Sequence, residues 1–195
     1  RQILLAHVEL RVPGEHNVRN ALSVLAVHYI LGNSLPEVAN ALSTFTGSGR
    51  RFEVIGEVNG ITIIDDYAHH PTKIKATLAA ARTRYPGRRI IAVWQPHTYS
   101  RTQALEDDFA ASFTDADEVI ITGIYASREK ERPYSMKQLL NKISGSAVRH
   151  IADLPGVTAY LAQNLQPGDV MIVLSAGDAD RVCRDVQLLI KERKG

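Results

Sequence analysis

From residue 50 onward, short apolar runs alternate with longer amphipathic segments, and few folds are compatible with that order. The first two runs, 52–58 and 61–65, flank Asn59-Gly60, the strongest short-range signal for a β-hairpin. The alternation predicts an α/β fold: a mostly parallel sheet, helices on both faces and an antiparallel hairpin strand. Further strands are predicted at 88–94, 118–122, 148–151 and 169–174. Helices are predicted at 71–85, 100–113, 135–143, 155–165 and 178–191.

Residues 1 to about 47 have another pattern, a strand-like run followed by two helices. The run covers residues 3–8, and the first helix begins near Gly14. Ser34 can cap the second helix, with Pro36 in its first turn and Glu37 closing a capping box. The chain begins inside the strand-like run without a methionine, so we expect an N-terminal portion to be missing.

Composition excludes several classes of protein. The net charge is only +2 over 195 residues, too balanced for a nucleic-acid-binding face. Cys183 is the single cysteine, so neither an internal disulfide nor a multi-cysteine metal site can form. No apolar run is long enough to cross a bilayer, and there is no signal peptide. We therefore expect a cytoplasmic protein.

Unusual polar residues follow three of the predicted strands, at 65–71, 95–102 and 175–178. Ligands of open α/β sheets bind beyond the carboxyl ends of the strands, and in a parallel sheet these turns share one edge. We expect them to converge on one cleft. The long charged turn at 123–134 can be a lid or a solvated loop, and surface connections are usually the latter.

Each polar turn also has a structural interpretation. The two aspartates at 65 and 66 can form a turn, because their side chains bond local backbone groups. Adjacent His69 and His70 point in different directions, so we expect no metal site from this pair, and His70 can cap the helix that Pro71 opens. The small residues at 175–178 lack the Lys-Ser/Thr of a phosphate loop.

Together these turns offer aspartate, tyrosine, two histidines and arginine on one rim. Such groups can orient a carboxylate and an amine while transferring protons near neutral pH. Arg50 and Arg51 add guanidinium groups that can reach phosphate. The residues alone predict an anion-binding cleft in an α/β domain.

In order and spacing the motifs resemble those of the Mur ligases, in particular the branch of that family that adds L-alanine. The resemblance rests on residues 14–22, 49–53, 65–71, 95–102 and 176–178. It implies three domains: one that binds the UDP-sugar, a central one that binds ATP, and a Rossmann-like C-terminal domain. Residues 1–47 would be the tail of the central ATP-binding domain, and residues 48–195 would be the C-terminal domain.

The resemblance also implies a reaction. ATP, with Mg²⁺, would phosphorylate the lactyl carboxylate of UDP-N-acetylmuramate, and the amine of L-alanine would attack the acyl phosphate to give an amide, ADP and phosphate. Cations would stabilise the developing charge, and closure of the C-terminal domain would exclude water. The Mg²⁺ ligands are expected mainly in the absent part of the central domain.

Carried over by position, the family's functional residues fall into two groups. Contacts to ATP would come from Asn17 and Asn20 (adenine), Arg51 (phosphates) and Asp66 (ribose). The acyl group and L-alanine would face Tyr67, His69, His97 and Arg101, with His69 and His97 as the catalytic pair. Arg101 would pair with the amino-acid carboxylate. Thr98 stands where some relatives have arginine, so one cationic contact of those relatives would be absent here.

Three rival interpretations remain open. A murein tripeptide ligase, which serves peptidoglycan recycling, is similar but tends to differ around Gln95-Pro96-His97. Glutamate-adding and folylpolyglutamate ligases fit residues 65–71 poorly. The chain could also be a stand-alone, non-catalytic binding domain. Because it contains no Gly-x-x-Gly-Lys-Ser/Thr nucleotide loop, we expect the chain alone to lack ligase activity.

Overall fold

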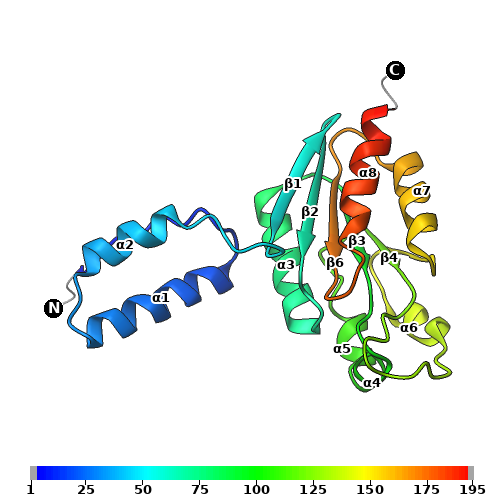
Figure 1. Ribbon diagram of the computed structural model, residues 1–195, viewed down its shortest axis with the longest axis horizontal. Helices are drawn as coiled ribbons and strands as arrows, with labels where there is room; N and C mark the ends of the chain where they lie inside the picture. The colour runs from blue at the N-terminus through cyan, green and yellow to red at the C-terminus, as the bar shows by residue number, and fades with distance from the viewer. Residues whose placement is uncertain (1–3, 193–195) are drawn as a thin grey trace. The chain divides into compact units, whose positions relative to one another are not determined.

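The computed structural model describes residues 4–192, and the chain divides into two compact units, Arg1–Gly49 and Arg50–Gly195 (Figure 1). The division falls two residues beyond the predicted one at 47. The assignment of these units to particular ligase domains stays a prediction.

The first unit is a pair of helices, α1 (Glu15–Ile30) and α2 (Leu35–Thr44). Pro36 lies in the first turn of α2 as predicted, but Ser34 makes no side-chain capping bond. The prediction of a strand at 3–8 was wrong for residues 4–8, because residues 4–10 have no strand conformation. Residue 3 lies outside the described residues. An apolar run becomes a strand only where a neighbour satisfies its backbone groups, and no described segment pairs with this one.

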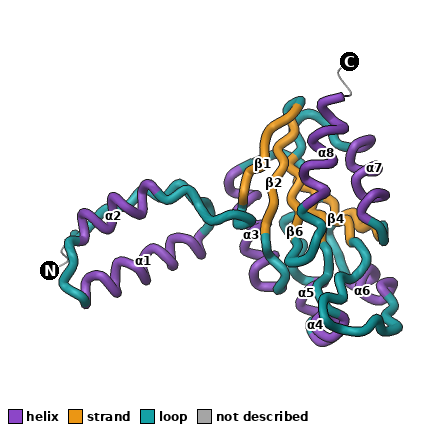
Figure 2. Tube along the Cα trace, in the orientation of Figure 1, coloured by secondary structure: helices purple, strands orange, loops and turns teal. Residues whose placement is uncertain are grey.

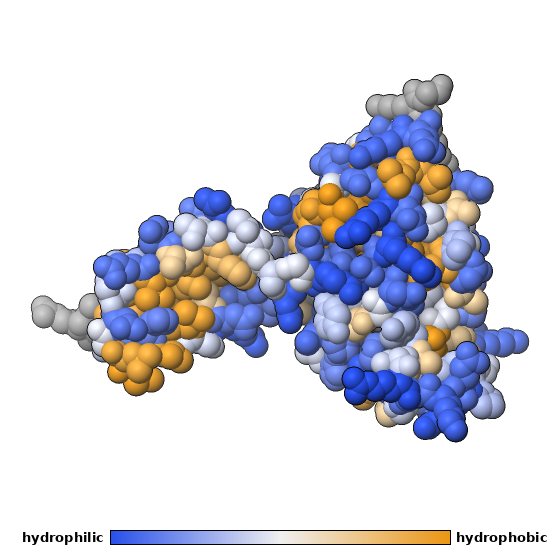
Figure 3. All heavy atoms as spheres, viewed as in Figure 1, coloured by the Kyte–Doolittle hydropathy of each residue, from blue (hydrophilic) through white to orange (hydrophobic). Residues whose placement is uncertain are grey.

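The surface of this helix pair is unusually apolar (Figure 3). Leu22 is 59% exposed and Ile30 is 82% exposed. A groove of about 510 Å³ runs between the helices, with Val24, Val38 and Phe45 among its lining residues. Exposed apolar area of this extent marks a surface that another segment or protein covers.

The second unit contains a six-stranded sheet in the order β1-β2-β6-β3-β4-β5. Its first two strands are antiparallel and the rest are parallel, which confirms the predicted mixed sheet. Asn59 and Gly60 form the hairpin turn with φ of 52° and 77°, the left-handed values that such turns require. The strands are β1 (Glu53–Val58), β2 (Ile61–Asp66), β3 (Ile90–Trp94), β4 (Glu118–Ile121), β5 (Ala147–His150) and β6 (Val170–Leu174).

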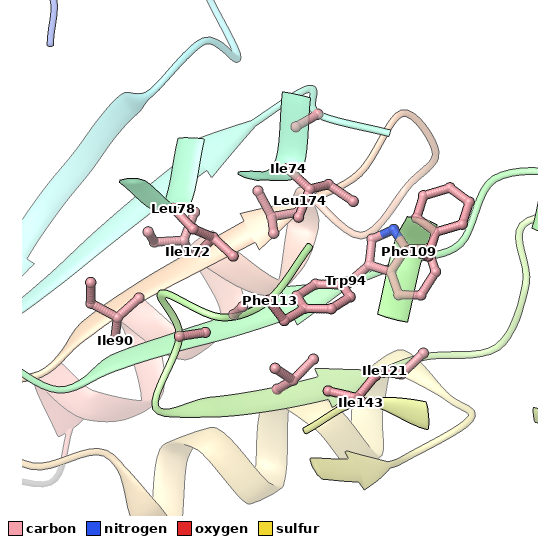
Figure 4. Packing of buried hydrophobic residues seen from close by; sticks show 14 of the residues in the cluster. Ile74, Leu78, Ile90, Trp94, Phe109, Phe113, Ile121, Ile143, Ile172 and Leu174 are labelled. Atoms are coloured by element: carbon pink, nitrogen blue, oxygen red, sulfur yellow. The ribbon is translucent and has the colours of Figure 1, made fainter. Parts of the chain in front are cut away.

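Helices cover both faces of the sheet, because buried residues alternate between the faces along each strand (Figure 1). One core packs α3, α5 and α6 on the sheet, and the other packs α7 and α8. In the first core the Trp94 ring lies 4.6 Å from Phe109 and 5.4 Å from Phe113, centroid to centroid (Figure 4). The helices are α3 (Pro71–Arg84), α4 (Tyr99–Ala104), α5 (Glu106–Ala110), α6 (Met136–Lys142), α7 (Leu154–Asn164) and α8 (Arg181–Glu192).

Two predicted helices differ from those observed. The single helix expected at 100–113 is broken into α4 and α5 at Leu105, whose φ of −116° is not helical and whose side chain packs against the core. The last helix begins at Arg181 rather than at Asp178, because Asp178 belongs to a turn at the end of β6. The remaining boundaries agree within two residues. Within residues 4–192 no helix is long and apolar enough to cross a membrane.

Candidate functional site

The carboxyl ends of β2, β6 and β3 are neighbours in the sheet, in parallel register from Asp66 to Leu174 to Trp94. Backbone bonds continue past the strand ends, from Ser175 N–H to the Asp66 carbonyl (3.0 Å) and from Gln95 N–H to the Leu174 carbonyl (3.1 Å). The three polar turns therefore leave the same edge of the sheet, as the sequence predicted.

Gln95 fastens two of these turns together from a buried position. Its amide oxygen accepts hydrogen bonds from the Ser175 hydroxyl (2.7 Å) and Ala179 N–H (3.2 Å), and its amide nitrogen donates to Asp178 (2.9 Å). A Cβ atom on Gly177 would lie 2.4 Å from the same amide oxygen, so only glycine fits there. The Gln95 side chain thus has a structural role at the site.

Arg50 joins the start of the sheet unit to the same edge. Its guanidinium pairs with Asp65 (3.0 Å), donates to the Ser175 carbonyl (2.9 Å) and lies over the Tyr67 ring at 5.2 Å from the centroid. Asp65 is 3% exposed, and burial raises its carboxyl pKa more than Arg50 lowers it. The Arg50 guanidinium is thus engaged by groups of the protein itself. Its neighbour Arg51 is exposed. Of the two guanidinium groups expected to reach phosphate, only that of Arg51 is without such contacts among those described.

Asp66 supports the turn that follows β2. Its two carboxylate oxygens accept from Phe52 N–H and Ala68 N–H, both at 2.8 Å. Burial raises the pKa of this carboxyl, and the two backbone hydrogen bonds oppose the shift. The structural interpretation of this aspartate is therefore confirmed. The side chain of Thr77 is a further donor to this carboxylate, so the protein itself uses part of its remaining acceptor capacity.

The four residues predicted to face the acyl group and L-alanine form one cluster. The Tyr67 and His69 rings meet edge to face with centroids 5.2 Å apart, and the His69 and His97 rings are 5.8 Å apart. Arg101, one turn into α4, places Nη1 3.3 Å from Nδ1 of His97. The cluster thus combines a cation, two imidazoles and an aromatic ring at the sheet edge.

Hydrogen bonds assign opposite tautomers to the two histidines. Nδ1 of His69 lies 2.8 Å from the Tyr67 carbonyl, which only accepts, so this nitrogen must donate and Nε2 carries the lone pair. Nδ1 of His97 faces the Arg101 guanidinium, which only donates, so this nitrogen must accept and Nε2 carries the hydrogen. One free ring nitrogen is therefore a proton acceptor and the other a donor.

Both imidazoles are held neutral. Burial lowers the pKa of His69, and nearby positive charge on Arg101, Lys73 and His70 adds to the effect, while the bond to the Tyr67 carbonyl opposes it. Burial also lowers the pKa of His97, with further lowering by Arg101 and His69. Since free histidine titrates near pH 6.5, both side chains are mainly uncharged at pH 7.

Sequence reasoning missed Tyr125, which lies in the segment predicted to be a solvated loop. Its ring stacks on His97 with centroids 5.7 Å apart and planes inclined by 26°. The segment 123–134 has no helix or strand of its own (Figure 2), but it lies against the residues that follow β3. The available signal was the pair Ile124-Tyr125, two bulky side chains at the start of a mostly polar, charged stretch.

The remaining predicted residues have other surroundings within their own elements. His70 caps α3 by accepting from Thr72 N–H at 3.4 Å, as its structural interpretation required. Among residues 4–192, no three metal-ligating side chains come together. Asn17 and Asn20 belong to α1 of the first unit, where the Asn17 amide donates to the Pro13 carbonyl at 2.7 Å and Asn20 is exposed.

Curated proteins and solved structures resemble the chain over nearly its whole length. The UDP-N-acetylmuramate–L-alanine ligase of Caldanaerobacter subterraneus subsp. tengcongensis is 49% identical over 177 residues, covering 89% of this chain and 38% of that protein. The ligase of the same name from Desulforamulus reducens is 44% identical, covering 97% and 42%. The chain thus spans about two-fifths of these relatives.

The fold agrees with these relationships. The crystal structure of UDP-N-acetylmuramate–alanine ligase from Thermotoga maritima matches with a TM-score of 0.79 and 29% identity, covering 95% of this chain and 40% of that one. A murein peptide ligase from Psychrobacter arcticus matches with a TM-score of 0.71 and 28% identity, covering 94% and 38%.

A single solved domain of a related putative ligase, from Haemophilus ducreyi, is 28% identical. It covers 72% of this chain and 99% of its own chain, with a TM-score of 0.58. Residues 50–177 match the family described as "Mur ligase, glutamate ligase domain". Motif order, fold and sequence identity lead to one conclusion: the chain belongs to the Mur ligase family.

Proposed function

We propose that this chain provides the amino-acid-accepting part of an ATP-dependent ligase that joins L-alanine to UDP-N-acetylmuramate in the cytoplasm, during peptidoglycan precursor synthesis. The observation that carries the proposal is the cluster of Tyr67, His69, His97 and Arg101 at one sheet edge. Support for L-alanine as the amino acid comes from the names of the relatives that are 44–49% identical.

In this proposal Arg101 binds the carboxylate of L-alanine. Its Nη1 is directed to His97, and the guanidinium fork retains further N–H donors for a carboxylate. The free amino acid is an ammonium ion at neutral pH and has no lone pair with which to attack an acyl group. The Nε2 lone pair of His69 accepts the ammonium proton, and the resulting amine can then form the new C–N bond.

The Nε2 hydrogen of His97 serves the opposite purpose in the proposal. It donates a hydrogen bond to an oxygen of the acyl group, where negative charge develops as the amine adds. The exposed Tyr67 ring borders the same space. Two neutral imidazoles beside a fixed cation allow proton acceptance and hydrogen-bond donation to occur side by side.

ATP, when bound, supplies the phosphoryl group that converts the carboxylate into an acyl phosphate. The exposed Arg51 would meet its phosphates, and the acceptor capacity that Asp66 retains beside its bonds to Phe52, Ala68 and Thr77 suits a ribose hydroxyl. The amides of Asn17 and Asn20 match the donor–acceptor edge of adenine. We assign the Mg²⁺ ligands to a part of the enzyme outside this chain.

The test is ADP release by the full-length ligase and by the 195-residue chain. With UDP-N-acetylmuramate and ATP, the full-length enzyme should release ADP only when L-alanine is added. The chain alone should release none, because we infer that it lacks the phosphate-binding loop and the sugar site. L-alanine-dependent ADP release by the chain alone would overturn this division of the active site.

A further inference from the structure

The connection between β4 and α6 carries a short segment, residues 123–129, that lies along the turn following β3. We refer to it as the strap. Its backbone pairs with that turn in both directions: Tyr125 N–H donates to the Pro96 carbonyl (2.8 Å), and Thr98 N–H donates to the Tyr125 carbonyl (2.9 Å). The residue between these two bonds is His97, so the strap holds the backbone on either side of a proposed catalytic group.

The side chain of Tyr125 fixes the His97 ring as well. The two rings stack at 5.7 Å, and Nδ1 of the same imidazole faces the Arg101 guanidinium. Gly177, at the end of β6, makes this position possible, because a Cβ there would lie 2.7 Å from Cγ of Tyr125. The Tyr125 ring is therefore confined between the β6 turn and His97, and it remains 37% exposed at the edge of the cluster.

Glu129, at the end of the strap, holds the start of α4. Its carboxylate accepts from the Ser100 backbone N–H at 3.1 Å and from the Ser100 hydroxyl. These bonds lower the pKa of the Glu129 carboxyl, so it is ionised at neutral pH. Arg101 directly follows Ser100 in the sequence, so the strap also fixes the backbone position of Arg101 through Ser100.

Thr98, between these two contacts, has a strained backbone. Its φ of 65° and ψ of 143° are unfavourable for a β-branched residue. Such a conformation persists only where surrounding contacts enforce it. Here Tyr125 accepts from the Thr98 N–H on one side, and the Thr98 hydroxyl accepts from Arg101 N–H (3.4 Å) on the other.

We propose that Tyr125 and Glu129 are positioning residues of the amino-acid site: through the strap they hold His97 and Arg101 in the relative geometry that binds the substrate carboxylate. The inference rests on the proposed function of that cluster. It assigns a role to a segment outside the motifs that identify the family in the sequence.

The first test measures the geometry without reference to activity. Imidazole ¹⁵N and ¹H NMR of the 195-residue chain should show His97 with its hydrogen on Nε2. Tyr125→Leu should mix the His97 tautomers and move its titration midpoint, and Tyr125→Phe should leave both near the wild-type values. Tyr85→Leu, which removes a partly buried tyrosine elsewhere in the sheet unit, is the matched control. An unchanged His97 in Tyr125→Leu would overturn the proposal.

The second test separates the strap from the proposed function. In the full-length ligase, Tyr125→Leu and Glu129→Ala should raise the KM for L-alanine about three- to tenfold, while the KM for ATP stays within about twofold. Glu131→Ala, two residues farther along, is the control for Glu129. If the wild-type enzyme uses L-alanine but both variants keep its KM, the strap proposal fails. If the wild-type enzyme never uses L-alanine, the proposed function fails, and the NMR result still decides the positioning role.

Discussion

At the scale of single residues, the proposed amino-acid site combines one permanent cation with two neutral imidazoles of opposite tautomer. Burial is the main reason that both rings are neutral, and the Arg101 guanidinium adds to it while directing Nδ1 of His97 to accept. The Tyr67 carbonyl has the reverse effect on His69. Two residues of the same type thereby acquire different chemical roles from their hydrogen-bond partners.

Arg101→Ala in the full-length ligase should raise the KM for L-alanine about tenfold or more, the loss expected when a charged hydrogen-bond partner is removed. His69→Ala should also raise this KM, because the ammonium loses its proton acceptor. Neither variant should unfold, since both side chains are only partly buried. Arg184→Ala, on the exposed face of α8, is the control. Wild-type alanine kinetics in both variants would remove the assignment of the amino-acid site.

The histidines also predict how stability depends on pH. Because the pKa of both His69 and His97 is lower in the folded protein than in the unfolded chain, the unfolded state binds more protons below about pH 6.5. The free energy of unfolding should therefore not depend on these two groups well above that pH. It should decrease as the pH falls from about 6.5 towards their lower folded pKa values, and level off below those values. Urea unfolding at pH 5 to 7.5 measures this slope. A double substitution, His69→Gln with His97→Gln, should flatten it, and an unaltered slope would contradict the assignment.

At the scale of elements, the site depends on how the ends of β2, β6 and β3 are joined. Gln95 bridges two of these ends from a buried position, so its removal affects more than its own turn. Gln95→Leu would leave the Ser175 hydroxyl and the Ala179 N–H without their partner. We expect it to lower the free energy of unfolding by about 2 kcal/mol or more.

Gln138→Leu, on the exposed face of α6, makes the same chemical change without buried partners and should cost less than about 0.5 kcal/mol. Urea denaturation with constant m-values distinguishes the two variants. Equal midpoints would show that the Gln95 bonds do not hold the two turns together.

Much of the sheet unit is predictable because its signals are local. Asn59-Gly60 marks the hairpin whatever the rest of the chain does, and parallel strands place successive polar turns at one edge. The break between α4 and α5 is different. Helical spacing continues through Leu105, and the break coincides with the packing of this side chain against the core, a tertiary contact.

The features that could not be predicted depend on tertiary contacts. The run at 3–8 has the composition of a strand, but its described residues have no partner. The pairing of Arg50 with Asp65 and the stacking of Tyr125 on His97 join segments whose proximity follows only from the strand order. A sequence shows which residues can form a site, and topology decides which of them meet.

At the scale of the whole molecule, the two units differ in how they are stabilised. Both buried cores of the sheet unit are built from residues beyond Gly49, whereas the helix pair exposes much of its apolar surface. We therefore expect the fragment 50–195 to fold without the helix pair. Its free energy of unfolding should agree within about 1 kcal/mol with that of the sheet transition in the 195-residue chain.

Near-ultraviolet circular dichroism of the buried Trp94 follows that transition, since Trp94 is the only tryptophan. Loss of the Trp94 signal in the fragment would show that the helix pair is required for the fold. A related domain from Haemophilus ducreyi was solved by itself, which supports the expectation that the fragment 50–195 folds without the helix pair.

The most specific part of the proposed function is that the cluster at the sheet edge belongs to an L-alanine-adding ligase. Its most direct test is the mass of the product that the full-length enzyme forms from UDP-N-acetylmuramate and ATP, when L-alanine, D-glutamate and the tripeptide L-alanyl-γ-D-glutamyl-meso-diaminopimelate are present in equal amounts. We predict UDP-N-acetylmuramoyl-L-alanine as the dominant product, with less of it formed by Arg101→Ala. A product carrying the tripeptide or D-glutamate would contradict the proposed function.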